Sequence, residues 1–319
     1  AELNQPFFME TSDPGVFEKI AVKTRISGGA SAVSLSDGHL TLDDSSMTFG
    51  GSAKAFEKPD IALDIALDQI DLDRYLPPSS EKEKTGTPAS QEKKEKAPDA
   101  GPDYGPLRKL VLDGKLKIGQ MKAANVTVSN MVAHITAQNG RIAVDPLSLN
   151  LYQGTLTSVL GLDVRQKAPQ TSIKLDLKGV QAGPLIRDAA AKDLISGTLT
   201  ADADLIMAGD TPDRIKKTLD GRGQLIFTDG AIQGVDIAGT VRNAAAKAGM
   251  AEKTEEKPKT DFAELRVPFS VGQGVFHVTD AGMKSPLLRV NAAGKAFLIK
   301  EELDFRLEPK LVGTLKGQG

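Results

Sequence analysis

The segment DIALDIALDQIDLDRYLP, residues Asp60 to Pro77, decides the fold class because it can be read as a helix or as a strand. A helix would place Asp60, Asp64 and Asp68 on one face as a ladder of carboxylates, which suggests a cation site or acid chemistry. Like charges four residues apart destabilise a helix by about 0.2–0.5 kcal/mol per pair, and Asp is a poor helix former. The segment therefore favours a strand.

As a strand, the same segment has one apolar face and one solvent face, because successive side chains point to opposite sides. The apolar face carries Ile61, Leu63, Ile65 and Leu67. The other face carries Ala62, Asp64, Ala66 and Asp68. This interpretation predicts a half-buried strand whose aspartates take part in no chemistry.

The same alternation of apolar and polar residues recurs along most of the chain. Residues 147–151, 199–205 and 303–307 each carry apolar side chains at every second position. Strands with one apolar and one polar face are typical of antiparallel sheets. Dipeptides that favour hairpin turns are Gly28-Gly29, Asp37-Gly38 and Asn139-Gly140. The sequence therefore predicts a mainly β protein with antiparallel strands.

Three short helices are predicted among the strands. Thr211 can cap a helix over residues 212–219, and Pro212 suits its first turn. A second helix is predicted over residues 184–194, because Gly183-Pro184 can open it, and a third over residues 235–250, from the helical spacing of its apolar side chains. All three are too short to form a helical core, so we expect them to decorate the sheet.

Two charged segments divide the chain. Residues 79–105 and 251–260 are rich in Lys, Glu and Pro and have no apolar periodicity, which predicts a disordered linker or insertion and a second, shorter linker. They separate a first β repeat unit over residues 1–78, a second unit with short helices over 106–250, and a C-terminal β segment over 261–319.

Two pairs of stretches indicate an internal repeat. Residues 38–55 resemble residues 140–158, and residues 64–76 resemble residues 174–186. When the register of the second pair is extended back by one residue, Leu63, Ile65 and Leu67 correspond to Ile173, Leu175 and Leu177. Asp64 and Asp68 correspond to lysines, so a carboxylate site in the first copy would be absent from the second. The repeat preserves the apolar face and changes the charges.

Composition excludes several kinds of chemistry. The 319 residues include no Cys, which removes disulfides, thiolate nucleophiles and Cys-ligated zinc. His39, His134 and His277 lie far apart and lack metal-ligand spacing. A formal net charge of -2, without basic patches interleaved with aromatic residues, gives no sign of nucleic-acid binding. We therefore expect a protein that is not an enzyme and has no cofactor or metal site.

Two segments near the end of the chain resemble the C-terminal region of the AsmA family. They are GRGQLIFTDGAIQGVDIAGTVRNA, residues 221–244, and SPLLRVNAAGKAFLIKEELDFRLEPKLVGTLKGQG, residues 285–319. The resemblance implies a periplasmic protein of Gram-negative bacteria, held at the inner membrane by an N-terminal anchor absent from this sequence. It also implies an elongated, curled antiparallel sheet built from β repeats, with an aliphatic concave face similar to that of bridge-like lipid-transfer proteins.

Two alternative functions are consistent with this resemblance. The alternation of apolar and polar residues fits both and does not distinguish between them. In the first, the apolar face is a groove that binds phospholipid acyl chains and contributes to lipid transport between the inner and outer membranes. In the second, the face is a closed core, and the protein is a scaffold or assembly factor for outer-membrane proteins, with other envelope proteins as partners. The candidate groove residues are Ile61, Leu63, Ile65, Leu67, Ile173, Leu175 and Leu177.

Overall fold

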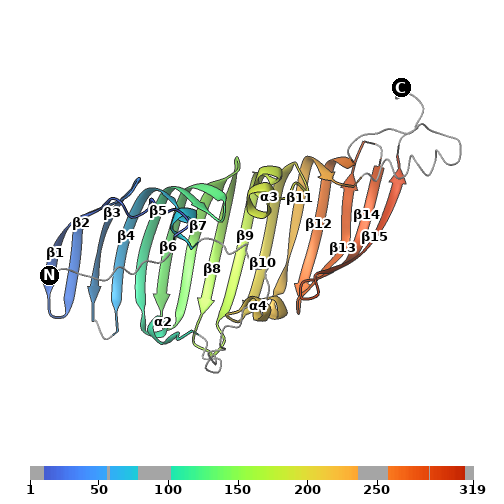
Figure 1. Ribbon diagram of the computed structural model, residues 1–319. Helices are drawn as coiled ribbons and strands as arrows, with labels where there is room; N and C mark the ends of the chain where they lie inside the picture. The colour runs from blue at the N-terminus through green and yellow to red at the C-terminus, as the bar shows by residue number, and fades with distance from the viewer. Residues whose placement is uncertain (1–10, 56–57, 78–101, 236–257, 287, 313–319) are drawn as a thin grey trace, which may run out of the picture.

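A computed structural model describes residues 11–55, 58–77, 102–235, 258–286 and 288–312. They form one elongated, curved sheet of fifteen strands that lie side by side in chain order, with short helices at its edges (Figure 1). The predicted mainly β fold is therefore confirmed.

The first nine strands are β1 Ile20–Gly29, β2 Ala32–Leu42, β3 Ser45–Lys54, β4 Asp60–Asp71, β5 Val111–Ala123, β6 Val126–Gln138, β7 Arg141–Leu151, β8 Gly154–Asp163 and β9 Gln170–Gln181. The remaining strands are β10 Thr198–Ala208, β11 Asp220–Gln233, β12 Lys259–Gly272, β13 Val275–Lys284, β14 Leu288–Phe297 and β15 Glu302–Leu311. The helices are α1 Leu72–Tyr75, α2 Gly105–Lys109, α3 Ala182–Ala190 and α4 Pro212–Thr218.

Neighbouring strands are antiparallel, except that β4 and β5 are parallel. Because β4 and β9 run in the same direction, α1 and α3, which directly follow them, lie at the same edge. We call this edge, at Leu72 and Ala182, the α1–α3 rim. Helices α2 and α4 lie at the opposite edge, at Gly105 and Pro212, which we call the α2–α4 rim (Figure 1).

Within the segment Asp60 to Pro77, Asp60–Asp71 form strand β4, as the alternation predicts, whereas Leu72–Tyr75 form helix α1. The four aliphatic side chains of β4 are half-buried, whereas Asp60, Asp64 and Asp68 are exposed. The Asp68 carboxylate accepts hydrogen bonds from the backbone N–H groups of Ser46 (2.7 Å) and Gln69 (2.5 Å). The aspartates therefore lie on the solvent face, and Asp68 also holds the neighbouring strand in place.

The predicted turns are only partly correct. Asn139-Gly140 joins β6 to β7 with positive φ at both residues (52° and 73°), which a tight hairpin requires. Gly28-Gly29 ends β1 just before a turn. The turn predicted at Asp37-Gly38 is wrong, because these residues form a bulge inside β2. A Cβ on Gly38 would lie 2.4 Å from the Phe49 carbonyl oxygen, so the glycine permits close strand contact there.

The helix predictions differ in outcome. Helix α4 begins at Pro212, and the Thr211 hydroxyl accepts a hydrogen bond from the Arg214 N–H (3.4 Å). Helix α3 begins two residues before its predicted start and ends at Ala190, because Ala191 adopts a left-handed conformation. The helix predicted over 235–250 lies outside the described residues, apart from its first residue.

The predicted linkers also fall largely outside the described residues. Residues 79–101 and 251–257 are not described. Lys259 and Thr260, within the second predicted linker, belong to β12. The division of the chain into three β units stays a prediction, although the described strands of all three lie in one sheet.

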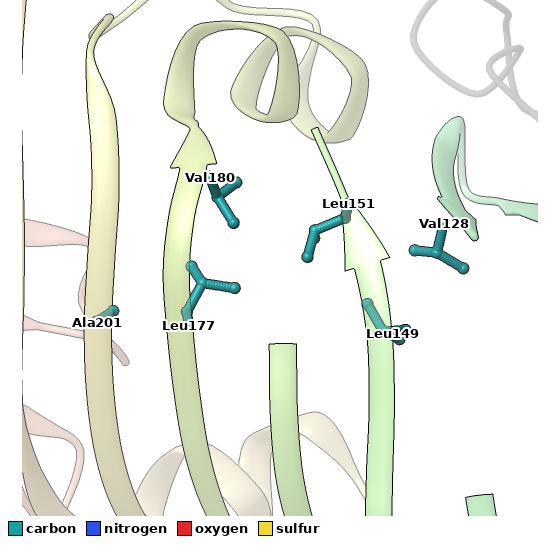
Figure 2. Close-up of a cluster of buried hydrophobic side chains, with 6 residues drawn as sticks. All are labelled: Val128, Leu149, Leu151, Leu177, Val180 and Ala201. Carbon is teal, nitrogen blue, oxygen red and sulfur yellow. The ribbon is translucent and has the colours of Figure 1, made fainter. Parts of the chain in front are cut away.

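Buried side chains gather on one face of the sheet near the α1–α3 rim. The first cluster contains Val128, Leu149, Leu151, Leu177, Val180 and Ala201. Figure 2 shows Leu151 of β7 and Val180 of β9 pointing toward each other, although β8 lies between their strands. The face that carries this cluster is therefore concave.

Helix α3 packs on this concave face. Its Leu185 contacts the first cluster. Its Ile186 contacts a second cluster, which consists of Ala182, Phe227, Phe262, Met283, Leu288 and Val290. The helix also contacts both β9 and β6, which are three strands apart in the sheet. Helix α3 therefore lies across the concave side. Full burial of a large aliphatic side chain contributes about 1.5–3 kcal/mol, and the half-buried Leu185 and Ile186 contribute less.

Candidate functional site: the apolar face

One row of directly paired residues crosses all fifteen strands and contains only aliphatic, aromatic or glycine residues. From β1 to β15 this central row is Ile26, Leu35, Gly51, Leu63, Gly114, Ile135, Val144, Leu160, Ile173, Leu205, Gly221, Val271, Phe276, Ala296 and Leu303. Directly paired residues of neighbouring strands point to the same face. The sheet thus carries an uninterrupted apolar line between its two edge strands.

A second row lies beside the central row on the same face. From β3 to β10 it is Phe49, Ile65, Leu116, Ala133, Leu147, Ser158, Leu175 and Ala203. Its one polar member, Ser158, is 5% exposed and donates its hydroxyl hydrogen to the Lys174 carbonyl oxygen (2.7 Å). Because that hydroxyl is satisfied by the backbone, the second row also presents an apolar surface.

The structure places the predicted groove residues of both repeats on this one face. Leu63 and Ile173 belong to the central row, and Ile65 and Leu175 belong to the second row. Leu177 is paired with apolar residues of both neighbouring strands and is 6% exposed. The remaining candidates of β4, Ile61 and Leu67, are half-buried and are flanked by Ala53 and Leu112, and by Met47 and Ile118. Their role as a lipid groove stays a prediction.

The sheet register also shows where the predicted repeat holds. The pairing of residues 64–76 with 174–186 matches β4 and α1 to β9 and α3. The pairing of residues 38–55 with 140–158 is displaced, because the β2–β3 turn at Asp43-Asp44 corresponds in hairpin order to the β7–β8 turn at Tyr152-Gln153. Alternating sequences resemble one another in several registers, so similarity alone did not determine the register of this hairpin.

The apolar face is most exposed at the two ends of the sheet. Val22 and Ile26 of β1 are 62% and 66% exposed, and Leu303 and Leu307 of β15 are 77% and 53% exposed. In the described part of the chain, a single layer of strands is present, and the face is covered by no second sheet. The described residues of this face therefore do not form the closed core of a β-sandwich.

Two hydrogen bonds between tyrosine and aspartate hold the helices of the α1–α3 rim. Tyr75 of α1 donates to Asp43 in the β2–β3 turn (2.8 Å), and Tyr152 in the β7–β8 turn donates to Asp188 of α3 (2.6 Å). The two repeats thus make the same helix-to-turn contact with donor and acceptor exchanged. Burial and the bond to Asp43 raise the pKa of Tyr75 to about 12, and burial and the bond to Asp188 raise the pKa of Tyr152.

The segment before β1 attaches to the same rim. The Asp43 carboxylate accepts backbone hydrogen bonds from Lys19 (3.1 Å) and Phe17 (2.8 Å), which hold its pKa below the usual range. The Phe17 ring packs edge-on against Tyr75, with centroids 5.2 Å apart. Sequence reasoning missed these contacts, because their members are far apart along the chain and match no local motif.

Within the described residues, no group of three or more His, Asp or Glu side chains could hold a metal ion. His134 lies 2.9 Å from the Asp113 carboxylate, and both side chains are partly or largely exposed. No helix in the described part of the chain is long and apolar enough to span a bilayer. The candidate site is the extended apolar face, because its central row is continuous from β1 to β15.

Comparison with known proteins agrees with this architecture. The model of the AsmA family matches residues 21–281. Protein AsmA of Escherichia coli K12 is 19% identical over 289 residues, which cover 88% of this chain and 47% of that protein. The chain thus spans about half the length of this relative. No solved structure matches the chain. Because the family model covers most of the sequence, the chain belongs to the AsmA family.

Proposed function

We propose that the protein binds phospholipid acyl chains along its concave apolar face and contributes to lipid transport between the inner and outer membranes. The central row carries this proposal, because it presents apolar or glycine residues on every strand from β1 to β15. A lipid-binding surface must shield many methylenes, each contributing about 0.8 kcal/mol when removed from water. A continuous lining therefore matters more than any single contact.

The dimensions of the sheet are consistent with this role. Fifteen strands at a spacing of about 4.8 Å extend for roughly 65 Å along the central row. The acyl chains of one leaflet occupy about 15 Å, half the thickness of a bilayer's hydrocarbon core. The apolar face is therefore long enough to hold more than one lipid in succession.

Membership of the AsmA family supports a place in the bacterial envelope for this protein. We propose a periplasmic location, with attachment to the inner membrane through an N-terminal anchor and phospholipid as the main partner. The alternative, a scaffold for outer-membrane protein assembly with a closed core, is not favoured, because side chains such as Ile26 and Leu303 are exposed on the apolar face.

A photocrosslinking amino acid, placed on either side of one strand, tests the proposal without adding charge to the apolar face. We expect the crosslinker at Leu63, on the apolar face, to capture phospholipid when the protein is purified from membranes. The matched control is Ala62, the preceding residue, which points to the solvent face. Equal capture at both positions, or capture at neither, would contradict lipid binding by the apolar face.

A further inference from the structure

A row of uncharged polar side chains crosses the solvent face of the sheet near the α1–α3 rim. Asn150 of β7 lies between Leu149 and Leu151, which are buried on the concave face, so its side chain points to the opposite face. Residues paired directly along the row share this direction. From β4 to β8 this polar row is Gln69, Gln120, Ser129, Asn150 and Thr155. Five neighbouring strands thus present amides and hydroxyls side by side.

The polar row differs from other parts of the solvent face, which are charged. On β4, β5 and β6, for example, Asp64, Lys115 and His134 form a row of directly paired residues. The polar row contains no Asp, Glu, Lys or Arg from β4 to β8. On β9, the next strand, it reaches Lys178, whose ammonium lies 3.2 Å from the Asp176 carboxylate. The row therefore suits an uncharged ligand.

Two adjoining hollows lie along the polar row. The first has a volume of about 620 Å³, within the range of small-molecule sites, and the four members of the row on β5 to β8 all line it. The second, of about 240 Å³, shares Gln120 with the first and also includes the β4 member of the row. Its charged side chains form ion pairs, Lys122 with Asp71 (3.7 Å) and Arg74 with Asp44 (3.5 Å). A ligand along the row would therefore meet charges that are already compensated.

The side chains of the polar row have hydrogen-bonding groups to offer. In the described part of the chain, its four members on β5 to β8 make no side-chain hydrogen bond within the protein. Each amide or hydroxyl can both donate and accept, as the hydroxyl groups of a sugar also do. Tyr75 and Tyr152 border the two hollows, and a tyrosine ring offers an apolar surface for the C–H groups of a sugar ring.

We propose that the polar row binds an uncharged, extended, β-linked glycan that lies across the strands. Neighbouring strands are about 4.8 Å apart, close to the length of one sugar unit in such a glycan, so successive strands can contact successive sugars. Hydrogen bonds from amides and hydroxyls would hold the sugar hydroxyls, and no charge on the ligand is needed. The inference concerns the face opposite the apolar face and does not rest on the proposed function.

Titration calorimetry with chitotetraose and cellotetraose, two uncharged glycans of this shape, tests the inference. We expect the parent protein to bind at least one of them and Asn150→Ala to weaken that binding by about tenfold, because hydrogen bonds to the amide are lost. The matched control is Asn291→Ala on β14. Asn291 follows the buried Val290, is exposed on the solvent face and lies outside both hollows. Thermal melting of both variants should match the parent protein, because both amides are exposed.

The outcomes are distinct from those of the lipid proposal. If the parent protein binds neither glycan, or if Asn150→Ala binds as tightly as Asn291→Ala, the polar row is not a glycan site. Binding should also persist at high salt, because the ligand carries no charge; binding abolished by salt would overturn the inference. Phospholipid capture by a crosslinker at Leu63 should be equal with and without Asn150→Ala, so either proposal can fail while the other stands.

Discussion

Leu63 of β4 and Ile173 of β9 lie on the same row of paired residues, joined through Gly114, Ile135, Val144 and Leu160. The same sequence separation links Ile65 to Leu175 on the second row. Each repeat therefore adds its strands to the sheet without shifting the apolar face toward either rim. Because the strands pair in this register, the apolar residues of the two repeats form one continuous surface.

A charge on the apolar face should block lipid binding. Leu67→Asp would place an ion among acyl chains, which costs several kcal/mol if the site is dry. We expect this variant to fold and to lose crosslinking to a photoreactive phospholipid. The control is Asp64→Asn, on the solvent face, whose stability should change by less than about 0.5 kcal/mol. A folded Leu67→Asp protein that crosslinks normally would contradict the groove.

The hydroxyl of Tyr152 should stabilise the α1–α3 rim. Tyr152→Phe removes the hydrogen bond to Asp188 and keeps the ring, so we expect the free energy of unfolding to fall by about 1 kcal/mol. Urea denaturation measures this change. Tyr104→Phe is the control, because Tyr104 precedes α2 at the other rim and makes no such bond to α3. A Tyr152→Phe midpoint equal to that of the control would show that the bond contributes nothing.

The raised pKa of Tyr75 predicts a loss of stability at high pH. Its neutral form is favoured in the folded protein, so this contribution is complete below pH 10, the ordinary tyrosine pKa. It is lost as the pH rises through about 12, where Tyr75 ionises in the folded state. Absorbance of tyrosinate, compared between the parent protein and Tyr75→Phe, should assign one late-titrating group to Tyr75. Titration of that group near pH 10 would contradict the bond to Asp43.

Two glycines of the central row should respond differently to the same substitution. Gly51→Ala would place a Cβ 2.4 Å from the Ala62 carbonyl oxygen, so the backbone must shift, at a cost of about 1–3 kcal/mol. Gly114→Ala meets nothing closer than 3.6 Å and should change stability by less than about 0.5 kcal/mol. Denaturant midpoints for the two variants measure the difference. Equal effects would mean that strand contact at Gly51 is looser than the structure shows.

The candidate site was partly predictable from sequence. Alternation placed Ile61, Leu63, Ile65 and Leu67 on one face of a strand, since the direction of each side chain depends only on its parity along that strand. Correspondence of Leu63 with Ile173 was also predicted, because the stretches that follow them, residues 64–76 and 174–186, resemble each other. The tyrosine–aspartate bonds were not predicted, because each joins a residue of a turn to a residue of a helix that lies more than thirty positions away in the sequence.

The sequence by itself determined that the chain forms strands with one aliphatic face, because the alternation of β4 and its counterparts is local. It also determined where α4 begins, through Thr211 and Pro212. Only the tertiary structure decided that Asp37-Gly38 is a bulge and Asp43-Asp44 a turn, because a glycine that permits close strand contact has the same local signal as a glycine that reverses the chain. The tertiary structure also decided that all fifteen strands share one uninterrupted apolar row. Lateral register depends on pairing between distant strands, and period-two patterns alone accept several registers.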